Sequence, residues 1–179
     1  VQMIGDYQEG DIAYADINGD NIIDDRDKKM IGNSYPRFSG GIDVNLNYKG
    51  WGLYMLGTTE LGVNTMKSNS YYWVKGNDKY SEVVLDRYHP VNNTEGNNNF
   101  VNSTFWLENS NFFRLKNVEL SYTFNTKRGN ALKKVKLFGR ATNLFVLSSE
   151  KNLDPEALNA GVTNYPVYRT ITGGVTLTF

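Results

Sequence analysis

The chain has 179 residues, a formal net charge of zero and no cysteine. Zero net charge provides no field that would attract nucleic acid, and the lack of cysteine excludes disulfides, thiolate nucleophiles and zinc–thiolate sites. The sequence contains no apolar run of about 18 residues, so we expect no transmembrane helix. Tyrosine, phenylalanine and glycine are abundant, a composition that favours β structure with polar loops.

Alternation of apolar and polar residues with a period of two is the dominant pattern of the sequence. In residues 37–48, apolar side chains take most even positions and polar or small ones the odd positions. Comparable alternation runs through residues 51–61, 112–124, 135–145 and 170–179. We therefore predict an all-β fold of antiparallel strands, with one apolar and one polar face. The apolar face is expected to include Ile42, Val44, Leu46, Val118, Leu120, Leu137, Val175 and Leu177.

The connections between these segments differ greatly in length. Residues 49–50 and 125–133 form short turns, whereas residues 62–111 and 147–165 form long polar loops. This asymmetry is typical of outer-membrane barrels, while a soluble sandwich usually has long loops at both ends. The strand ends beside the short turns carry aromatic residues, which favour a membrane interface, although aromatic residues also cap soluble cores. These residues are Tyr48, Trp51, Tyr122, Phe124 and Phe179.

Several stretches resemble, in the same order, the late part of SusC/RagA-type TonB-dependent transporters. The most extensive are residues 11–27, residues 112–124, which read Phe-Phe-Arg-Leu-Lys-Asn-Val-Glu-Leu-Ser-Tyr-Thr-Phe, and residues 168–179. Residues 87–90, Arg-Tyr-His-Pro, resemble the family's Arg-Trp-Thr-Pro loop. The departures from the family pattern lie mainly in residues 62–104, which leaves the substrate open.

The resemblance implies an antiparallel transmembrane barrel of about 22 strands around a plug, in the outer membrane of a Gram-negative bacterium. The chain would supply the last five strands, with residues 1–36 forming an extracellular loop and residues 37–179 the strands and their loops. The implied partners are the rest of the barrel and plug, membrane lipid, a SusD-like surface lipoprotein, and a TonB complex that acts through the N-terminal part. The implied activity is import of oligosaccharides, or less often of peptides.

Residues 16–27 have the ligand spacing of an EF-hand-like calcium loop. Gly19 and Asn21 tolerate the left-handed backbone that such a sharp turn requires. Asn21 stands where EF-hands use glycine, and the last ligand is the shorter Asp27, as in dockerin loops. We predict a structural Ca²⁺ site; the alternative is a solvated acidic turn whose carboxylates repel one another. The predicted ligands are Asp16, Asn18, Asp20, Ile22 through its carbonyl, Asp24 and Asp27.

Aromatic residues of the long loop are candidates for stacking on a sugar substrate, or for packing within the loop or against a lid protein. They are Tyr71, Tyr72, Trp73 and Trp106. Enzyme chemistry is not expected, because the single histidine, His89, lies in a polar loop and no nucleophile–base pair is evident. A second hypothesis is a soluble, calcium-stabilised β module that binds carbohydrate or protein, in which the apolar strand residues are buried together.

Overall fold

The computed structural model describes residues 12–72, 101–126, 131–162, 164–165 and 167–179. The chain divides into two compact units. The sheet unit comprises residues 35–63, 109–155 and 165–179, and the loop unit comprises residues 1–34, 64–108 and 156–164. The predicted division between residues 36 and 37 therefore lies near the start of the sheet unit, but parts of both long loops group with the N-terminal residues.

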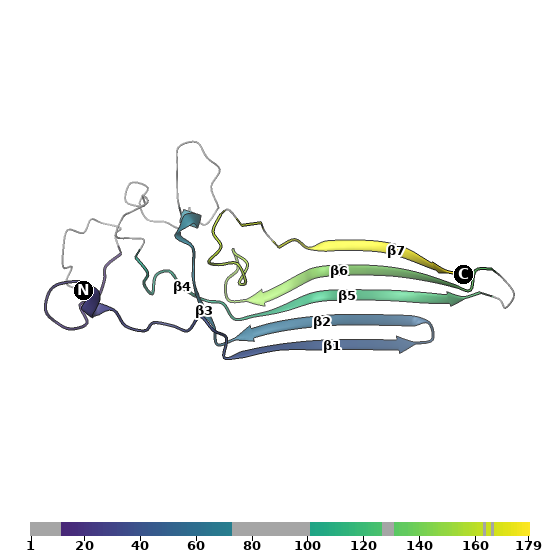
Figure 1. Cartoon of the computed structure of the whole chain (residues 1–179), viewed down its shortest axis with the longest axis horizontal. Helices are drawn as coiled ribbons and strands as arrows, with labels where there is room; N and C mark the ends of the chain where they lie inside the picture. Colours follow the sequence, from purple (N-terminus) through teal and green to yellow (C-terminus); the bar gives the residue numbers. More distant parts are fainter. Residues whose placement is uncertain (1–11, 73–100, 127–130, 163, 166) are drawn as a thin grey trace, which may run out of the picture. The chain divides into compact units, whose positions relative to one another are not determined.

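The predicted strand segments form one antiparallel sheet of five strands, in the order β1-β2-β5-β6-β7 (Figure 1). The period-two alternation dictates this result, because it gives each strand one face that avoids water and one that is solvated. Strands β1 and β7 are the edges of the sheet, so these five strands do not close into a barrel. The strands are β1 (Phe38–Tyr48), β2 (Trp51–Leu61), β5 (Phe112–Asn125), β6 (Lys134–Ser148) and β7 (Thr170–Thr178).

The strand register separates the two kinds of side chain onto opposite faces of the sheet. One cross-strand row of the apolar face contains Leu46, Leu53, Leu120, Gly139 and Gly173. The large side chains on this face remain accessible: Leu46 is 57% exposed and Leu120 is 50% exposed. None of the eight apolar residues predicted for this face is buried. The chain thus presents an apolar face that its described residues do not cover.

The opposite, polar face carries an ion cluster between β5 and β6. The Glu119 carboxylate accepts a hydrogen bond from Lys136 Nζ at 2.7 Å and another from Arg140 Nη2 at 2.5 Å. Glu119 is paired directly across the strands with Arg140, and opposite charges in cross-strand pairs stabilise a sheet. These side chains therefore satisfy one another on the polar face.

The turn between β1 and β2 is as tight as the sequence predicts. Lys49 and Gly50 both have positive φ angles, 45° and 91°, which is the backbone of a two-residue hairpin turn. A Cβ added at Gly50 would lie 2.9 Å from the Thr123 carbonyl oxygen. Glycine is therefore required here both by the turn and by the neighbouring strand.

The sequence pattern did not reveal an irregularity in the middle of the sheet. Asn117 and Leu115 pair with consecutive residues of β2, so Lys116 between them has no partner on that strand. On β6, Asn143 and Leu144 are likewise skipped in the pairing with β5, and Asn143 has a positive φ of 50°. This is a β-bulge, which adds a residue locally and increases the twist of the strand.

The loop unit contains short elements that were predicted only as loop. They are η1 (Asp25–Asp27), β3 (Asn64–Met66), η2 (Asn69–Tyr72) and β4 (Leu107–Asn109), with β3 and β4 paired in a two-stranded sheet. The described helices are short 3₁₀ turns, and none of them has the length and hydropathy needed to cross a bilayer.

The interior of the loop unit is built around an aliphatic and an aromatic residue. Leu158 is fully buried and Trp106 is 3% exposed. The main chain joins the segments that carry them, since Ser68 N donates to the Leu158 carbonyl at 2.8 Å and Lys67 N donates to the Trp106 carbonyl at 2.7 Å. The Lys67 side chain also pairs with Glu108 at 2.7 Å. These bonds give the segment after β2 a defined path.

A buried ion pair holds the loop that follows β6 against β5. Arg114 Nη2 lies 2.6 Å from Asp154 Oδ1, and the Arg114 side chain is only 4% exposed. The guanidinium also lies over the Phe112 ring, 5.8 Å from its centroid. Because a buried charge is costly without its partner, this pair fixes the position of residues near Asp154.

We expect Arg114→Met to destabilise the fold by about 2–4 kcal/mol, since it leaves a partly buried carboxylate without its cation. The control is Arg140→Met, which removes an exposed guanidinium and should cost about 1 kcal/mol or less. Urea unfolding followed by tryptophan fluorescence measures both. Equal losses for the two variants would show that the Arg114–Asp154 pair is no more important than a surface ion pair.

Candidate functional site

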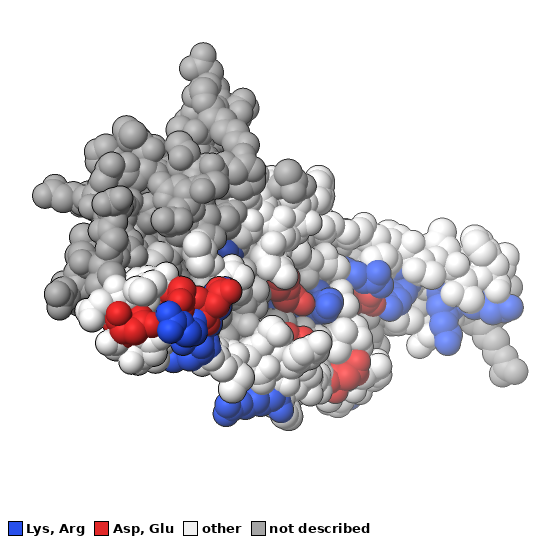
Figure 2. Space-filling view, turned by 60° about the vertical axis from the view of Figure 1, so that its left-hand side comes forward, with Lys and Arg blue, Asp and Glu red and all other residues white. Residues whose placement is uncertain are grey.

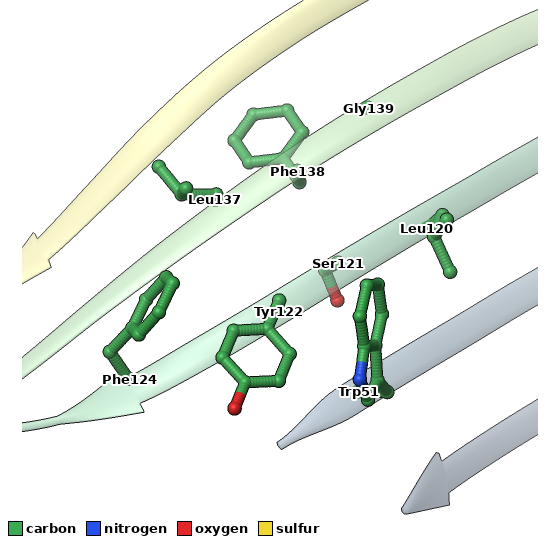
Figure 3. Close-up of a pocket in the computed structure, with 8 residues that line it drawn as sticks. All are labelled: Trp51, Leu120, Ser121, Tyr122, Phe124, Leu137, Phe138 and Gly139. Atoms are coloured by element: carbon green, nitrogen blue, oxygen red, sulfur yellow. The ribbon is translucent and has the colours of Figure 1, made fainter.

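Aromatic rings gather on the apolar face at the end of the sheet with the short turns. Trp51 and Tyr122 contact each other edge to face with ring centroids 4.9 Å apart, and Tyr122 and Phe124 do so at 4.6 Å. Figure 3 shows these rings on neighbouring strands. Tyr48 is the cross-strand partner of Trp51 and extends the row to β1. The predicted clustering of aromatic strand ends is therefore confirmed.

Residues 16–27 adopt the tightly wound backbone that the calcium-loop spacing predicts. Gly19 and Asn21 both have left-handed backbone, with φ angles of 78° and 62°. The Asp16 carboxylate accepts hydrogen bonds from the backbone N–H groups of Gly19 at 2.7 Å and Asn21 at 2.9 Å. Asn21 thus takes the backbone conformation for which EF-hands use glycine, and Asp16 holds the turn around its own carboxylate.

The last predicted ligand closes the loop onto its beginning. Asp27 Oδ1 accepts a hydrogen bond from Ile17 N at 2.8 Å, and Asp27 Oδ2 accepts one from Asp24 N at 2.9 Å. These contacts bring the two ends of the motif together although Asp27 lies ten positions after Ile17. In the middle of the loop, Asp20 Oδ1 accepts a hydrogen bond from Ile22 N at 2.9 Å.

A basic residue that the sequence reasoning missed lies among these carboxylates. Arg26 Nη2 is 2.7 Å from Asp20 Oδ2 and 2.8 Å from Asp24 Oδ2. The guanidinium therefore neutralises part of the repulsion expected between the carboxylates. The sequence did contain a signal for this pairing: Arg26 directly precedes Asp27, the last predicted ligand. A cation within an acidic loop is close enough to pair with the carboxylates of that loop.

The described residues contain no group of three or more acidic or histidine side chains arranged to hold a metal ion. The side chains of the predicted ligands instead accept hydrogen bonds from backbone N–H groups or pair with Arg26, and all of this loop is exposed to solvent or partly so. Calcium binding here stays a prediction. The loop's donor set, oxygen atoms of aspartate and asparagine, suits a hard cation.

Hydrogen bonding lowers the pKa of two carboxyl groups in this loop, for different reasons. The pKa of Asp24 is lowered from its usual 3.8, first by the hydrogen bond from the Arg26 side chain and then by the Arg26 backbone N–H. The pKa of Asp27 is also lowered from 3.8, chiefly by the backbone N–H groups of Asp24 and Ile17. Both groups are therefore ionised wherever the loop is folded at neutral pH.

The aromatic residues predicted to contact substrate differ in their surroundings. Trp106 is 3% exposed and contacts the Phe105 ring edge to face at 5.0 Å, so it packs in the loop unit and offers no open ring to a sugar. Tyr71 is half-buried, and its hydroxyl donates to the Ala157 carbonyl at 3.2 Å. The Tyr72 side chain and the whole of Trp73 lie outside the described residues, as does His89.

Known proteins that resemble the chain share one name. TonB-dependent receptor P26 of Formosa agariphila is 30% identical over 95% of this chain, and TonB-dependent receptor P39 of the same organism is 29% identical over 85% of it. The chain is a homologue of TonB-dependent receptors. It spans about a fifth of the length of these relatives, 20% of P26 and 16% of P39. No protein-family model matches the sequence.

Solved structures agree with this homology at the level of the fold. The chain superposes on the RagAB peptide importer in its open-open state with a TM-score of 0.62, at 24% identity, over 85% of this chain and 18% of the other. The closed-closed state gives a TM-score of 0.63 at 23% identity. These superpositions confirm the predicted fold of antiparallel barrel strands, and the TonB-dependent receptors above confirm the predicted resemblance to TonB-dependent transporters.

We expect the pKa values of Asp24 and Asp27 to respond differently to Arg26→Gln. The pKa of Asp24 should rise toward its usual value, because its largest stabilising hydrogen bond is lost, whereas that of Asp27 should change little, because backbone N–H groups hold it. Carboxyl NMR titration in the presence of a chelator measures both. Parallel rises at both residues would contradict the separate causes assigned here.

The same shifts predict the pH dependence of the loop. A carboxyl whose pKa is lowered on folding contributes stability above its unfolded pKa and loses it as pH falls through the folded value. The loop should therefore remain ordered at pH 5 and loosen only below about pH 4. Amide exchange at Gly19 and Asn21 reports this, and loosening near pH 6 would be inconsistent with it.

Proposed function

We propose that the chain forms the last strands of a TonB-dependent transporter barrel that imports nutrients across the outer membrane of a Gram-negative bacterium. One observation carries the proposal: five contiguous antiparallel strands share a face whose large apolar side chains stay exposed, while the opposite face is polar and ion-paired. Lipid covers such an apolar face in a barrel wall, and water fills or wets the inside.

The open edges of the sheet support a position inside a larger barrel. Lipid does not tolerate unpaired backbone N–H and C=O groups, so a membrane sheet must close on itself. Strands β1 and β7 each have a free edge within the described sheet. The remaining strands of a longer protein would pair with both edges, and a plug would face the polar side of the sheet.

Partners and energy supply follow from the homology. A TonB complex would act through another part of the protein, and a SusD-like surface lipoprotein would cover the extracellular end. The likeness to the RagAB importer supports the second partner. The proposed substrates are oligosaccharides, with peptides as the alternative, and RagAB, whose structures the chain resembles, is a peptide importer. Tyr71, Tyr72 and Trp73 are retained as candidate substrate contacts.

A soluble β module is the competing function, and burial argues against it. Such a module would bury the apolar strand residues against one another or against a second layer. In the structure Ile42 is 62% exposed and Val175 is 60% exposed. The apolar face therefore needs a cover that the described part of the chain does not supply.

We also propose that residues 16–27 bind Ca²⁺ and so rigidify the segment that precedes β1. The left-handed Gly19 and Asn21 and the carboxylate contacts of Asp16 support this, since they give the loop the backbone of a calcium site. Arg26 occupies two of the carboxylates that the ion would use. Calcium would have to displace the guanidinium from Asp20 and Asp24.

A matched pair of charged substitutions tests the membrane assignment. Val175→Arg places a charge on the apolar face and should cost about 2–4 kcal/mol in a bilayer if it lies near the midplane. The neighbouring Thr176→Arg points to the polar face and should cost much less. The measurement is heat-modifiable gel mobility and urea unfolding of the complete receptor in lipid. Equal stability of the two variants in lipid would refute the barrel. Recovery of the unmodified receptor in the soluble fraction, without membranes, would refute it as well.

Calcium binding is tested by calorimetric titration of the protein with CaCl₂, with MgCl₂ as the comparison ion. We expect Asp16→Asn to weaken Ca²⁺ binding by ten-fold or more, on the order of 1.4 kcal/mol, because it removes a charged first ligand. Arg26→Gln should strengthen binding, because no internal cation then competes. If neither the unmodified protein nor Arg26→Gln releases or absorbs heat on addition of CaCl₂, residues 16–27 form a solvated acidic turn and do not bind calcium.

A further inference from the structure

The apolar face contains a hollow beside the aromatic rings. Its volume is about 510 Å³, and six of the residues that line it belong to the apolar face by the strand register. Figure 3 shows the rings and aliphatic side chains around it. The lining residues from the apolar face are Trp51, Leu120, Tyr122, Phe124, Leu137 and Gly139.

One glycine lines this hollow, and a second glycine lies next to it on the neighbouring strand. Gly139 and Gly173 are cross-strand partners on β6 and β7, next to Leu120 on β5. A Cβ at Gly139 would meet no atom within 4 Å, and one at Gly173 would only touch the Phe138 carbonyl oxygen at 4.0 Å. Neither glycine has the positive φ that a turn would require. The surrounding atoms would therefore allow a Cβ at both positions. Because both residues are glycine, the space above them stays empty.

The hollow offers a ligand almost no polar partner. Ser121 is the polar residue in its lining, and that side chain is 8% exposed with its hydroxyl donating to the Gly52 carbonyl at 3.4 Å. The surrounding groups are aromatic rings and aliphatic chains. An occupant must therefore be a hydrocarbon chain at this point.

The turn end of the same sheet is basic. Lys49 and Lys133 are exposed there and are named the basic rim, whereas the register places Lys134 on the polar face with Lys136. Lys133 Nζ is 3.1 Å from the Phe179 oxygen, which leaves it two further donors, and Lys49 Nζ lies 5.2 Å from the Tyr48 ring centroid. The described residues 44–54, 120–126 and 131–138 contain no aspartate or glutamate. Figure 2 likewise shows basic side chains at this end without acidic ones beside them.

The spacing between rim and hollow matches one lipid molecule. Lys133 precedes Gly139 by a rise of about 20 Å along the chain, or about 14 Å of depth for a strand tilted by roughly 45°. One leaflet of the hydrocarbon core is about 15 Å thick. A headgroup on the basic rim would therefore place its acyl chain at the level of the glycines.

We propose that the hollow and the basic rim together form a binding site for one anionic phospholipid. Its phosphate binds the lysines, its acyl chain lies over Gly139 and Gly173, and the Trp51 and Tyr122 rings flank the chain. The site rests on the proposed membrane function, since it requires this face to meet lipid. The proposed site differs from general contact with lipid, because it would prefer an anionic headgroup and would hold the lipid at one place on the sheet.

The test uses the complete receptor purified in mild detergent. Phosphatidylglycerol and phosphatidylethanolamine with identical acyl chains are added in equal amounts, and retained lipid is quantified by mass spectrometry after washing. The unmodified receptor should retain phosphatidylglycerol over phosphatidylethanolamine by about five-fold or more, the scale of one lysine near an anionic surface. Gly139→Leu, whose Cβ would meet no atom within 4 Å, should abolish most of this retention. If that variant does not fold, Gly173→Leu is used in its place.

Lys49→Gln combined with Lys133→Gln should remove the preference between the two lipids while total retention falls less. Ile42→Phe adds bulk to the same face away from the hollow and should retain lipid as the unmodified receptor does. Equal retention of both lipids by the unmodified receptor, or full retention by Gly139→Leu, would overturn the site. A receptor found outside the membrane fraction before any lipid is added would overturn the barrel as well, which separates the two failures.

Discussion

The structure depends on one constraint: a sheet with period-two alternation over five strands has an apolar face that this chain does not bury. Hydrophobic burial is the main favourable term in folding. Most of the apolar side chains on this face can be buried only by something other than the described residues. The backbone edges at β1 and β7 impose a second demand of the same kind. Lipid on the face and further strands on the edges meet both demands together, which explains why the barrel wall is the consistent interpretation.

The polar elements are satisfied locally, in contrast to the apolar face. Glu119 has two cations, Arg114 is held by Asp154 beneath the loop after β6, and the carboxylates of residues 16–27 bind backbone N–H groups or Arg26. Each of these contacts neutralises a charge within its own unit of the chain. Among the side chains that the structure describes, those that still need a cover are therefore mainly apolar and lie on one face of the sheet.

The sequence predicted the strands well because alternation is a local property that any extended segment of about ten residues reports. Glycine at position 50 and the aromatic strand ends were equally visible. The bulge at Asn143 was not, because an inserted residue leaves the composition of the strand unchanged and appears only as a shift in the register between β5 and β6. The short strands β3 and β4 have three residues each and no periodicity to detect.

The candidate site was predicted in part, for related reasons. Spacing alone indicated the turn at Gly19 and Asn21, and the backbone confirms the turn. Side-chain competition could not be read from spacing, so the pairing of Arg26 with the predicted ligands was missed. Trp106 was named both as a candidate for stacking on a sugar and as a residue that packs within the loop. Its burial, like that of Leu158, supports packing, which a polar loop sequence alone could not decide.

The bulge also divides two strands into parts with separate surroundings. Strands β5 and β6 have 14 and 15 residues, whereas about 9–11 residues cross a bilayer. In the proposed barrel, the stretch beyond the bulge would extend past the hydrocarbon into water. Arg114 lies in that stretch and pairs with Asp154 of the chain's own loop, so its charge would not meet lipid. The same two strands would then form membrane wall on one side of the bulge and support a loop outside the membrane on the other side.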